Sequence, residues 1–175
     1  KALALGGDEA IRVNTDSSDS FYIASQIAEV VRQTGGGYDL ILTGKETIDY
    51  NGSSIGGMLA ELLDQPYVAL ATKFELAGTK ATVTREIEGG EETCEVELPL
   101  VVSAQKGMAE ARIPNMRGIM AARTKPLKVV EPVSIEPLTS VTGFGLPPAK
   151  AGVKLVPADQ VEELVRLLHE EAKAI

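Results

Sequence analysis

The sequence has few of the side chains that build metal or redox centres. It contains one cysteine, Cys94, and one histidine, His169, among 175 residues. A single cysteine excludes an internal disulfide and is typical of a reducing compartment. Neither a zinc site nor a haem pocket can be assembled from one histidine and one cysteine. We therefore expect this chain to hold no metal of its own.

Aromatic residues, basic charge and long apolar runs are also scarce. Tryptophan is absent and aromatics make up 4% of the chain, which argues against a base-stacking surface. The 17 basic residues face 25 acidic ones, whereas proteins that bind a phosphate backbone cluster lysine and arginine. The longest apolar runs, such as residues 98–104, fall far short of the roughly 20 residues of a membrane helix. We expect neither a nucleic-acid partner nor membrane insertion.

What is present is the composition of a globular domain, with 44% hydrophobic and 24% charged residues. Residues 1–125 are expected to form one α/β domain. Residues 126–157 carry six prolines and cannot form a regular helix, so they are expected to lie extended. Residues 158–173 follow as an amphipathic helix. We therefore assign residues 126–175 to a C-terminal arm.

Strand and helix patterns alternate in the first part of the chain. Short apolar runs at residues 10–14, 38–43 and 67–71 predict strands, and helical spacing of apolar residues predicts helices at 21–33 and 55–63. Such alternation favours a parallel sheet with right-handed crossovers, in which the strand at 38–43 is buried on both faces.

The pattern changes after residue 72. Three short alternating segments, 73–76, 81–87 and 92–97, predict antiparallel hairpin strands. The apolar run 98–103 then predicts a return to the central sheet, and a helix is expected near residues 116–123. The expected fold class is therefore α/β, with a parallel sheet and an antiparallel hairpin insertion.

The most informative loop, residues 44–57, lies between a predicted parallel strand and a helix. In open α/β sheets this is where ligands bind. Its glycines allow close approach of the backbone, Ser53 and Ser54 offer hydroxyls, and the N–H groups of a helix start favour a phosphate. Asp49 or Asn51 could accept a hydrogen bond from a ribose hydroxyl. The alternative is a polar loop with serine caps, since the loop matches neither G-x-G-x-x-G nor Walker A.

Other candidates for chemistry are weaker. The acidic group Glu86, Glu88, Glu91 and Glu92 flanks a Gly-Gly turn, which favours a solvated hairpin tip over an acid/base pair. His169 lies beside two glutamates in the terminal helix, where a surface position is expected. No Ser/His/Asp set can be assembled. We therefore expect no catalytic side chains in this chain and favour a non-enzymatic role.

Several motifs together resemble a known family. Residues 83–92 (Val-Thr-Arg-Glu-Ile-Glu-Gly-Gly-Glu-Glu), followed by 98–103 (Leu-Pro-Leu-Val-Val-Ser), resemble the signature of the electron transfer flavoprotein β subunit. Residues 44–49 (Gly-Lys-Glu-Thr-Ile-Asp) and the pair Lys125-Pro126 fit the same family, in the same order and spacing. Family members are longer, and residues 1–16 match a stretch well inside them. The resemblance implies that the first strands of the domain precede this chain.

The resemblance implies a Rossmann-like nucleotide-binding domain in a heterodimer whose α subunit carries the redox-active FAD. The β subunit of this family usually holds a buried AMP, and flavin-bifurcating members hold a second FAD there. Ser54 and Ile55 stand where the family has Gln-Thr or Gln-Val, which leaves both ligands open. The implied cofactor-binding residues are Gly44, Lys45, Thr47, Asp49, Asn51, Gly52, Ser53, Ser54 and Ile55.

The family's recognition loop, which docks partner dehydrogenases, corresponds to about residues 104–126. Its apolar anchor aligns with Met116; the alternative is that Met116 caps a helix core. The family's Asn-Glu-Pro-Arg-Tyr is Ala-Glu-Ala-Arg-Ile at 109–113, which predicts a different choice of partner. The implied docking residues are Arg112, Met116, Arg117, Ile119 and Met120.

We therefore favour a non-catalytic β subunit that binds AMP, supports the FAD of the α subunit and docks acyl-CoA or other flavin dehydrogenases. The arm, residues 126–175, would pack on the α subunit. A second hypothesis is a bifurcating subunit with its own FAD and NADH as donor, and a third is a stand-alone nucleotide sensor. The expected location is the cytoplasm of a bacterium, or the mitochondrial matrix of a eukaryote.

Overall fold

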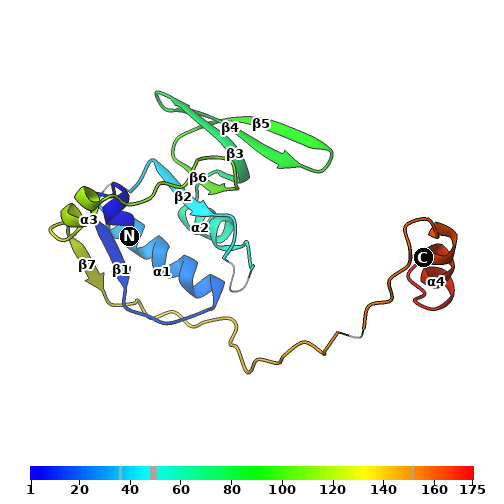
Figure 1. The fold of residues 1–175 in the computed structure, drawn as a ribbon. Helices are drawn as coiled ribbons and strands as arrows, with labels where there is room; N and C mark the ends of the chain where they lie inside the picture. The colour runs from blue at the N-terminus through cyan, green and yellow to red at the C-terminus, as the bar shows by residue number, and fades with distance from the viewer. Residues whose placement is uncertain (36, 48–50, 151) are drawn as a thin grey trace. The chain divides into compact units, whose positions relative to one another are not determined.

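The computed structural model describes residues 1–35, 37–47, 51–150 and 152–175. The chain divides into two compact units, Lys1–Val141 and Thr142–Ile175 (Figure 1). In chain order the elements are η1 (Ala2–Leu5), β1 (Ala10–Val13), α1 (Ser20–Gln33), β2 (Leu40–Gly44), α2 (Ile55–Leu63), β3 (Tyr67–Ala77), β4 (Lys80–Ile87), β5 (Gly90–Glu97), β6 (Leu100–Ala104), α3 (Met116–Ala122), β7 (Leu127–Val130) and α4 (Val161–Glu170).

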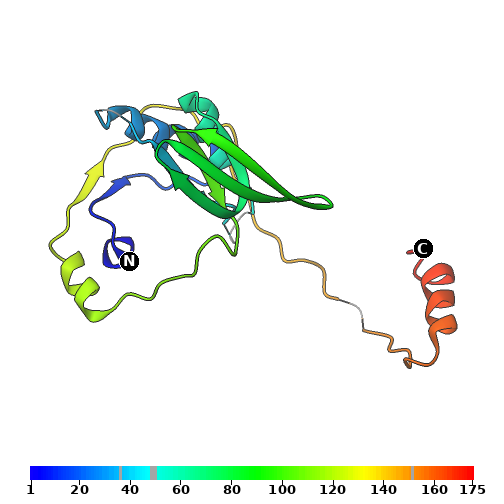
Figure 2. The ribbon, with the colours of Figure 1, turned by 90° about the horizontal axis from the view of Figure 1, so that it is seen from above.

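The main sheet joins a parallel half to an antiparallel half. Its strand order is β2-β6-β3-β4-β5, with β6 parallel to both β2 and β3. The remaining strands form an antiparallel hairpin extension, which reaches out beyond the rest of the sheet in Figure 2. The predicted mixture of parallel and antiparallel strands is therefore confirmed, as is the return of β6 to the parallel half.

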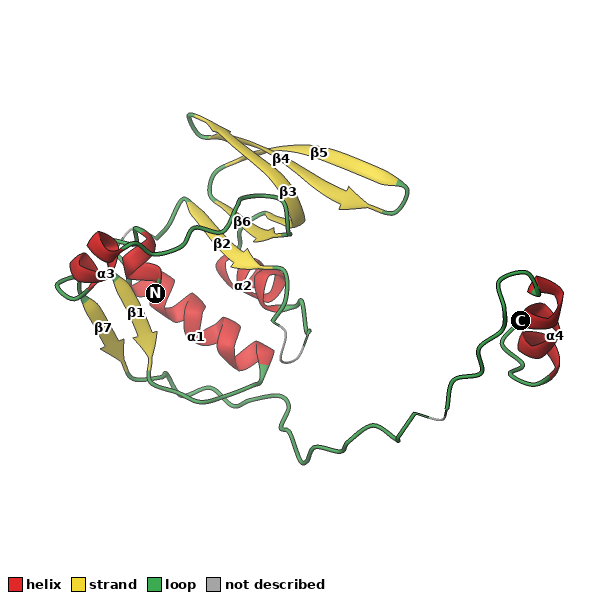
Figure 3. Ribbon diagram, viewed as in Figure 1, coloured by secondary structure: helices red, strands yellow, loops and turns green. Residues whose placement is uncertain are grey.

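A separate pair of parallel strands, β1 and β7, lies beside α1 (Figure 3). The register runs from Ala10 opposite Leu127 to Val13 opposite Val130. Strand β7 was not predicted from the sequence, because the prolines around it favoured an extended arm over the whole region. Four residues free of proline are enough for a short edge strand.

The strands predicted at 67–71 and 73–76 are a single strand of 11 residues, β3. Its first half pairs with β6 and its second half with β4, and the register shifts between Ala71 and Lys73. A bulge of this kind adds a residue without ending the strand. The hydroxyl of Thr72 donates to the carbonyl of Thr84 at 3.2 Å, so the irregular position keeps a hydrogen bond to β4.

The expectation that residues 38–43 are buried on both faces was wrong. Leu42 of β2 is 53% exposed. Within the described part of the chain β2 pairs only with β6, so it is an edge strand with fewer neighbours than a central one. The most buried strand of the sheet is β6, where Leu100, Val101 and Val102 have no exposed surface.

Helices α1 and α2 pack on each other, and α2 also packs on β2, β3 and β6. In α1 the fully buried residues are Ala24 and Ala28, whose small side chains allow a close approach. At the start of α2, a Cβ on Gly56 would lie 2.8 Å from the hydroxyl of Thr43 and 2.9 Å from that of Tyr67. Glycine at this position lets the helix start close to β2 and β3.

Part of the expected arm packs with the first unit. Residues 127–130 form β7, and the side-chain amide of Gln26 in α1 makes two hydrogen bonds to the backbone of Val133, at 2.8 and 2.9 Å. The unit ends at Val141, later than the boundary drawn at residue 126 from the sequence. In the second unit, α4 is shorter than expected, and Val161, Leu164 and Val165 are exposed.

Candidate functional site

The loop between β2 and α2 forms an open cleft together with the residues that precede α1. The cleft has a volume of about 140 Å³. The β2–α2 side contributes Thr43, Gly44, Lys45, Glu46, Thr47, Gly52, Ser53, Ser54 and Ile55, and the other side contributes Ser18 and Ser20.

Parallel pairing places this loop at the carboxyl end of β2. The backbone N–H of Lys45 donates to the carbonyl of Ala104 at 3.1 Å and so continues the pairing with β6 past the end of β2. Ser54 precedes α2, but its side chain makes no capping hydrogen bond. The first N–H groups of an α-helix have no partner within the helix, so those of α2 are available to an anion in the cleft.

The loop is shaped by its own side chains. Asn51 and Ser53 both have left-handed backbones, with φ of 49° and 50°. The hydroxyl of Ser53 donates to one carboxylate oxygen of Glu46 at 3.2 Å, and the ammonium of Lys45 lies 3.3 Å from the other. The charges of Lys45 and Glu46 compensate each other, so this pair adds no net charge to the wall of the cleft.

The cofactor-binding residues expected from the sequence line the cleft, with two exceptions. Asn51 is absent from the lining, and its N–H donates to the carbonyl of Thr47 at 2.8 Å. Asp49 lies outside the described residues. The role of all nine residues in ligand binding stays a prediction.

Ser18 and Ser20 also line the cleft, and they were not among the site residues expected from the sequence. A signal for them existed. They follow a predicted parallel strand, β1, and precede a helix, as the loop after β2 does. The loops at the carboxyl ends of parallel strands gather at the same edge of an α/β domain.

Between these two serines, Asp19 caps α1. Its carboxylate accepts a hydrogen bond from the N–H of Tyr22 at 2.7 Å, and from the hydroxyl and N–H of Thr139 at 2.6 and 2.9 Å. Asp19 is only 3% exposed. The Thr139 hydroxyl and the Tyr22 N–H stabilise the carboxylate and lower the pKa of Asp19, against the opposing effect of burial.

The lowered pKa of Asp19 predicts an acid-dependent loss of stability. As the pH falls, the unfolded chain takes up this proton first, so the contribution of Asp19 is complete above the ordinary aspartate pKa of about 3.9 and is lost as the pH falls through the lower folded-state pKa. We expect the urea midpoint to fall less on acidification in Asp19→Asn than in the unchanged protein. Parallel curves for the two proteins between about pH 6 and 3 would contradict the assignment.

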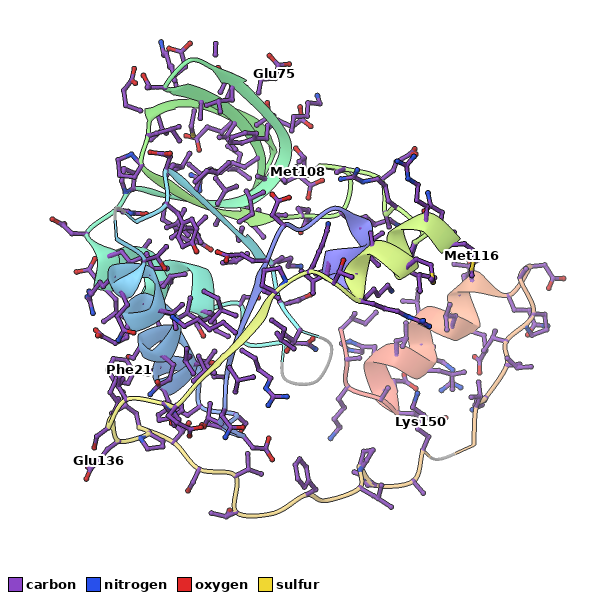
Figure 4. The ribbon with its side chains drawn as sticks, turned by 90° about the vertical axis from the view of Figure 1, so that its left-hand side faces the viewer. Phe21, Glu75, Met108, Met116, Glu136 and Lys150 are labelled. Carbon is purple, nitrogen blue, oxygen red and sulfur yellow. The ribbon has the colours of Figure 1, made fainter. Side chains whose placement is uncertain are left out.

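Helix α3 presents the docking residues expected from the resemblance. Its side chains Met116, Ile119 and Met120 are 73%, 40% and 55% exposed, and Arg112 and Arg117 are also exposed. Figure 4 labels Met116 at the start of the helix. An exposed fraction of 73% does not fit the alternative in which Met116 caps a helix core.

Helix α3 contacts the rest of the first unit through Gly118. The helix packs on η1, and a Cβ on Gly118 would overlap the carbonyl oxygen of Ala4. The ammonium of Lys125 donates to the carbonyls of Leu3 and Gly7 at 3.1 and 2.6 Å. Lys125, one of the basic residues near α3, therefore fixes η1 in place.

The other candidate groups behave as surface features. Glu92 pairs with Arg85 across the β4–β5 hairpin at 2.6 Å, and the Arg85 guanidinium lowers the pKa of Glu92. A general acid needs the opposite shift. Among the described residues, histidine, cysteine and carboxylate side chains form no cluster able to hold a metal ion. No helix in the described ranges has the length and apolar character to cross a bilayer.

Comparison with known proteins agrees with these observations. Residues 1–134 match the electron transfer flavoprotein domain family. The chain is 38% identical over 188 residues to the electron transfer flavoprotein subunit beta of Bacillus subtilis (strain 168), covering 99% of this chain and 72% of that protein. The protein of the same name from Syntrophomonas wolfei subsp. wolfei is 41% identical over 156 residues, covering 88% of this chain and 61% of the relative.

The human protein of that name is 35% identical over 177 residues, covering 97% of this chain and 68% of its own length. The chain thus spans about 61–72% of the length of these relatives. Because the similarity extends over nearly the whole chain and agrees with the motifs of the β2–α2 loop and the β4–β5 hairpin, this protein belongs to the electron transfer flavoprotein β subunit family.

Proposed function

We propose that this chain acts as the β subunit of a heterodimeric electron transfer flavoprotein. It binds AMP in the cleft between β2, α2 and the start of α1. It supports the FAD of an α subunit, and α3 docks partner flavin dehydrogenases such as acyl-CoA dehydrogenases. On this proposal the parallel half of the sheet is part of a Rossmann-like domain.

The cleft is the observation that carries the proposal. It combines the uncapped N-terminus of α2 with the hydroxyls of Ser18, Ser20 and Ser54, a set of donors suited to a phosphate. Its volume of about 140 Å³ is below the roughly 300–1,000 Å³ of a pocket for a whole small molecule. The described residues therefore fit the phosphate end of a nucleotide.

A second candidate function is a bifurcating subunit with its own FAD. It stays an alternative because Ser54 and Ile55 stand where family members carry Gln-Thr or Gln-Val, and the loss of the glutamine amide leaves both AMP and FAD open. The side chain of Ser54 makes no capping hydrogen bond to α2, so the donors at the start of the helix remain available to either nucleotide.

The remaining parts of the proposal concern the arm. Apolar side chains on α4 (Val161, Leu164, Val165) and before it (Phe144, Leu146, Val153, Leu155) are between 43% and 97% exposed. A surface of this kind is typical of an interaction site. We place the α subunit there, with the complex in the bacterial cytoplasm or the mitochondrial matrix.

The test is the nucleotide content of the purified heterodimer. After denaturation and chromatography with mass detection, we expect one FAD and one AMP per heterodimer. Two FAD and no AMP would establish the bifurcating alternative. The absence of any nucleotide beyond the FAD of the α subunit would contradict a nucleotide site in this chain.

A further inference from the structure

The segment Ser18–Ser20 contacts both the cleft and residues 137–141 of the arm. Ser18 and Ser20 line the cleft, and Asp19 between them binds Thr139. Ser18 also lines a second hollow of about 520 Å³, whose other wall is residues 137–141. We call residues 137–141 the strap. One short segment therefore contacts both the proposed ligand site and the strap.

The contact with the cleft is direct. A Cβ on Gly52 would lie 3.7 Å from the hydroxyl oxygen of Ser20 and 3.8 Å from that of Ser54. Residues on both sides of the cleft thus approach each other at Gly52. A movement of the segment that holds Asp19 would change the spacing of the hydroxyls that face a phosphate.

The strap depends on few contacts. Leu138 and Val141 are 70% and 49% exposed, whereas the hydrogen bonds of Thr139 to the buried Asp19 are short and involve a charged acceptor. The first unit ends two residues later, at Val141. A segment that buries little apolar surface opens locally at a lower free energy than the rest of the fold. Detaching the strap would therefore cost less free energy than unfolding the first unit.

We propose that the Asp19–Thr139 contact couples ligand binding in the cleft to attachment of the strap. The inference rests on the proposed nucleotide site and adds a regulation to it. An attached strap holds Ser18 and Ser20 in place against the β2–α2 loop, which raises the affinity for the nucleotide. By reciprocity of linked equilibria, the bound nucleotide favours the attached strap by the same factor. Occupancy of the site would thereby change the fraction of molecules in which the strap is attached.

The test compares two variants, each of which removes the hydrogen bonds that hold one part of residues 131–141 to the first unit. Thr139→Val keeps the side-chain size and removes the hydroxyl donor to Asp19. The control, Gln26→Met, removes the hydrogen bonds to Val133, which lie about two helical turns from Asp19. Both variants are made in the full heterodimer. AMP affinity is measured by calorimetry, and amide hydrogen exchange of residues 131–141 is measured with and without AMP.

We expect Thr139→Val to weaken AMP binding about threefold to tenfold and to abolish most of the protection that AMP gives to the strap amides. Gln26→Met should speed exchange near Val133 and leave AMP affinity unchanged. Unaltered affinity in Thr139→Val, or an equal loss in both variants, would overturn the coupling. A failure of the unchanged heterodimer to bind a nucleotide in this chain would instead overturn the proposed function, and the coupling with it.

Discussion

Replacing Ser54 by aspartate is expected to weaken AMP binding about tenfold to a hundredfold without destabilising the protein. Two unit charges 4 Å apart repel by about 4 kcal/mol at an effective dielectric constant of 20. If between a third and two thirds of that repulsion opposes binding of the phosphate, the affinity for AMP falls tenfold to a hundredfold. Aspartate is as good a residue as serine before a helix, and its charge favours the helix N-terminus. The substitution should therefore lower the affinity for AMP and leave the stability of the protein unchanged.

The matched control for this experiment is Ser54→Asn, which has nearly the size of aspartate and the same preference for the start of a helix but no charge. Calorimetric titration of AMP and thermal unfolding are measured on all three heterodimers. We expect the asparagine variant to bind AMP within a few-fold of the unchanged protein. Equal affinity in the aspartate and asparagine variants would show that the phosphate does not lie at the start of α2.

Truncation of Met116 is expected to slow electron transfer to a partner dehydrogenase. A central apolar anchor in an interface contributes about 2 kcal/mol or more, which corresponds to a roughly 30-fold fall in kcat/KM. Because Met116 is 73% exposed, its truncation removes little buried surface, and Met116→Ala should leave the melting temperature unchanged. The reduction of the heterodimer's flavin by a reduced partner dehydrogenase, followed at increasing partner concentration, provides the measurement.

Leu127→Ala provides the control for Met116. Leu127 is also exposed, at 56%, but it lies on β7 and outside the docking residues of α3. We expect this variant to transfer electrons at the unchanged rate and to keep its nucleotides. A similar loss in both variants would point to a general effect of surface truncation, and no loss in Met116→Ala would remove this residue from the docking site.

Local patterns in the sequence were sufficient for most of the elements. The helices at 21–33 and 55–63 and the hairpin strands were predicted within a few residues, because apolar spacing and Gly-rich turns depend on neighbours within a few positions. The β2–α2 loop was selected as a ligand site by the same local reasoning. The family could also be assigned from the sequence alone, because its motifs keep their order and spacing along the chain.

Only the tertiary structure showed how distant residues share the site. Asp19 and Thr139 are 120 residues apart, and Lys125 is 122 residues from the carbonyl of Leu3. Such contacts have no local signature, since a buried carboxylate and a capping aspartate look alike in sequence. The edge position of β2 and the continuity of β3 through its bulge likewise depend on which strands pair. The sequence by itself determined most of the elements, the loop and the family, whereas packing across the fold decided that Asp19 holds both the segment at the wall of the cleft and residue 139 of the arm.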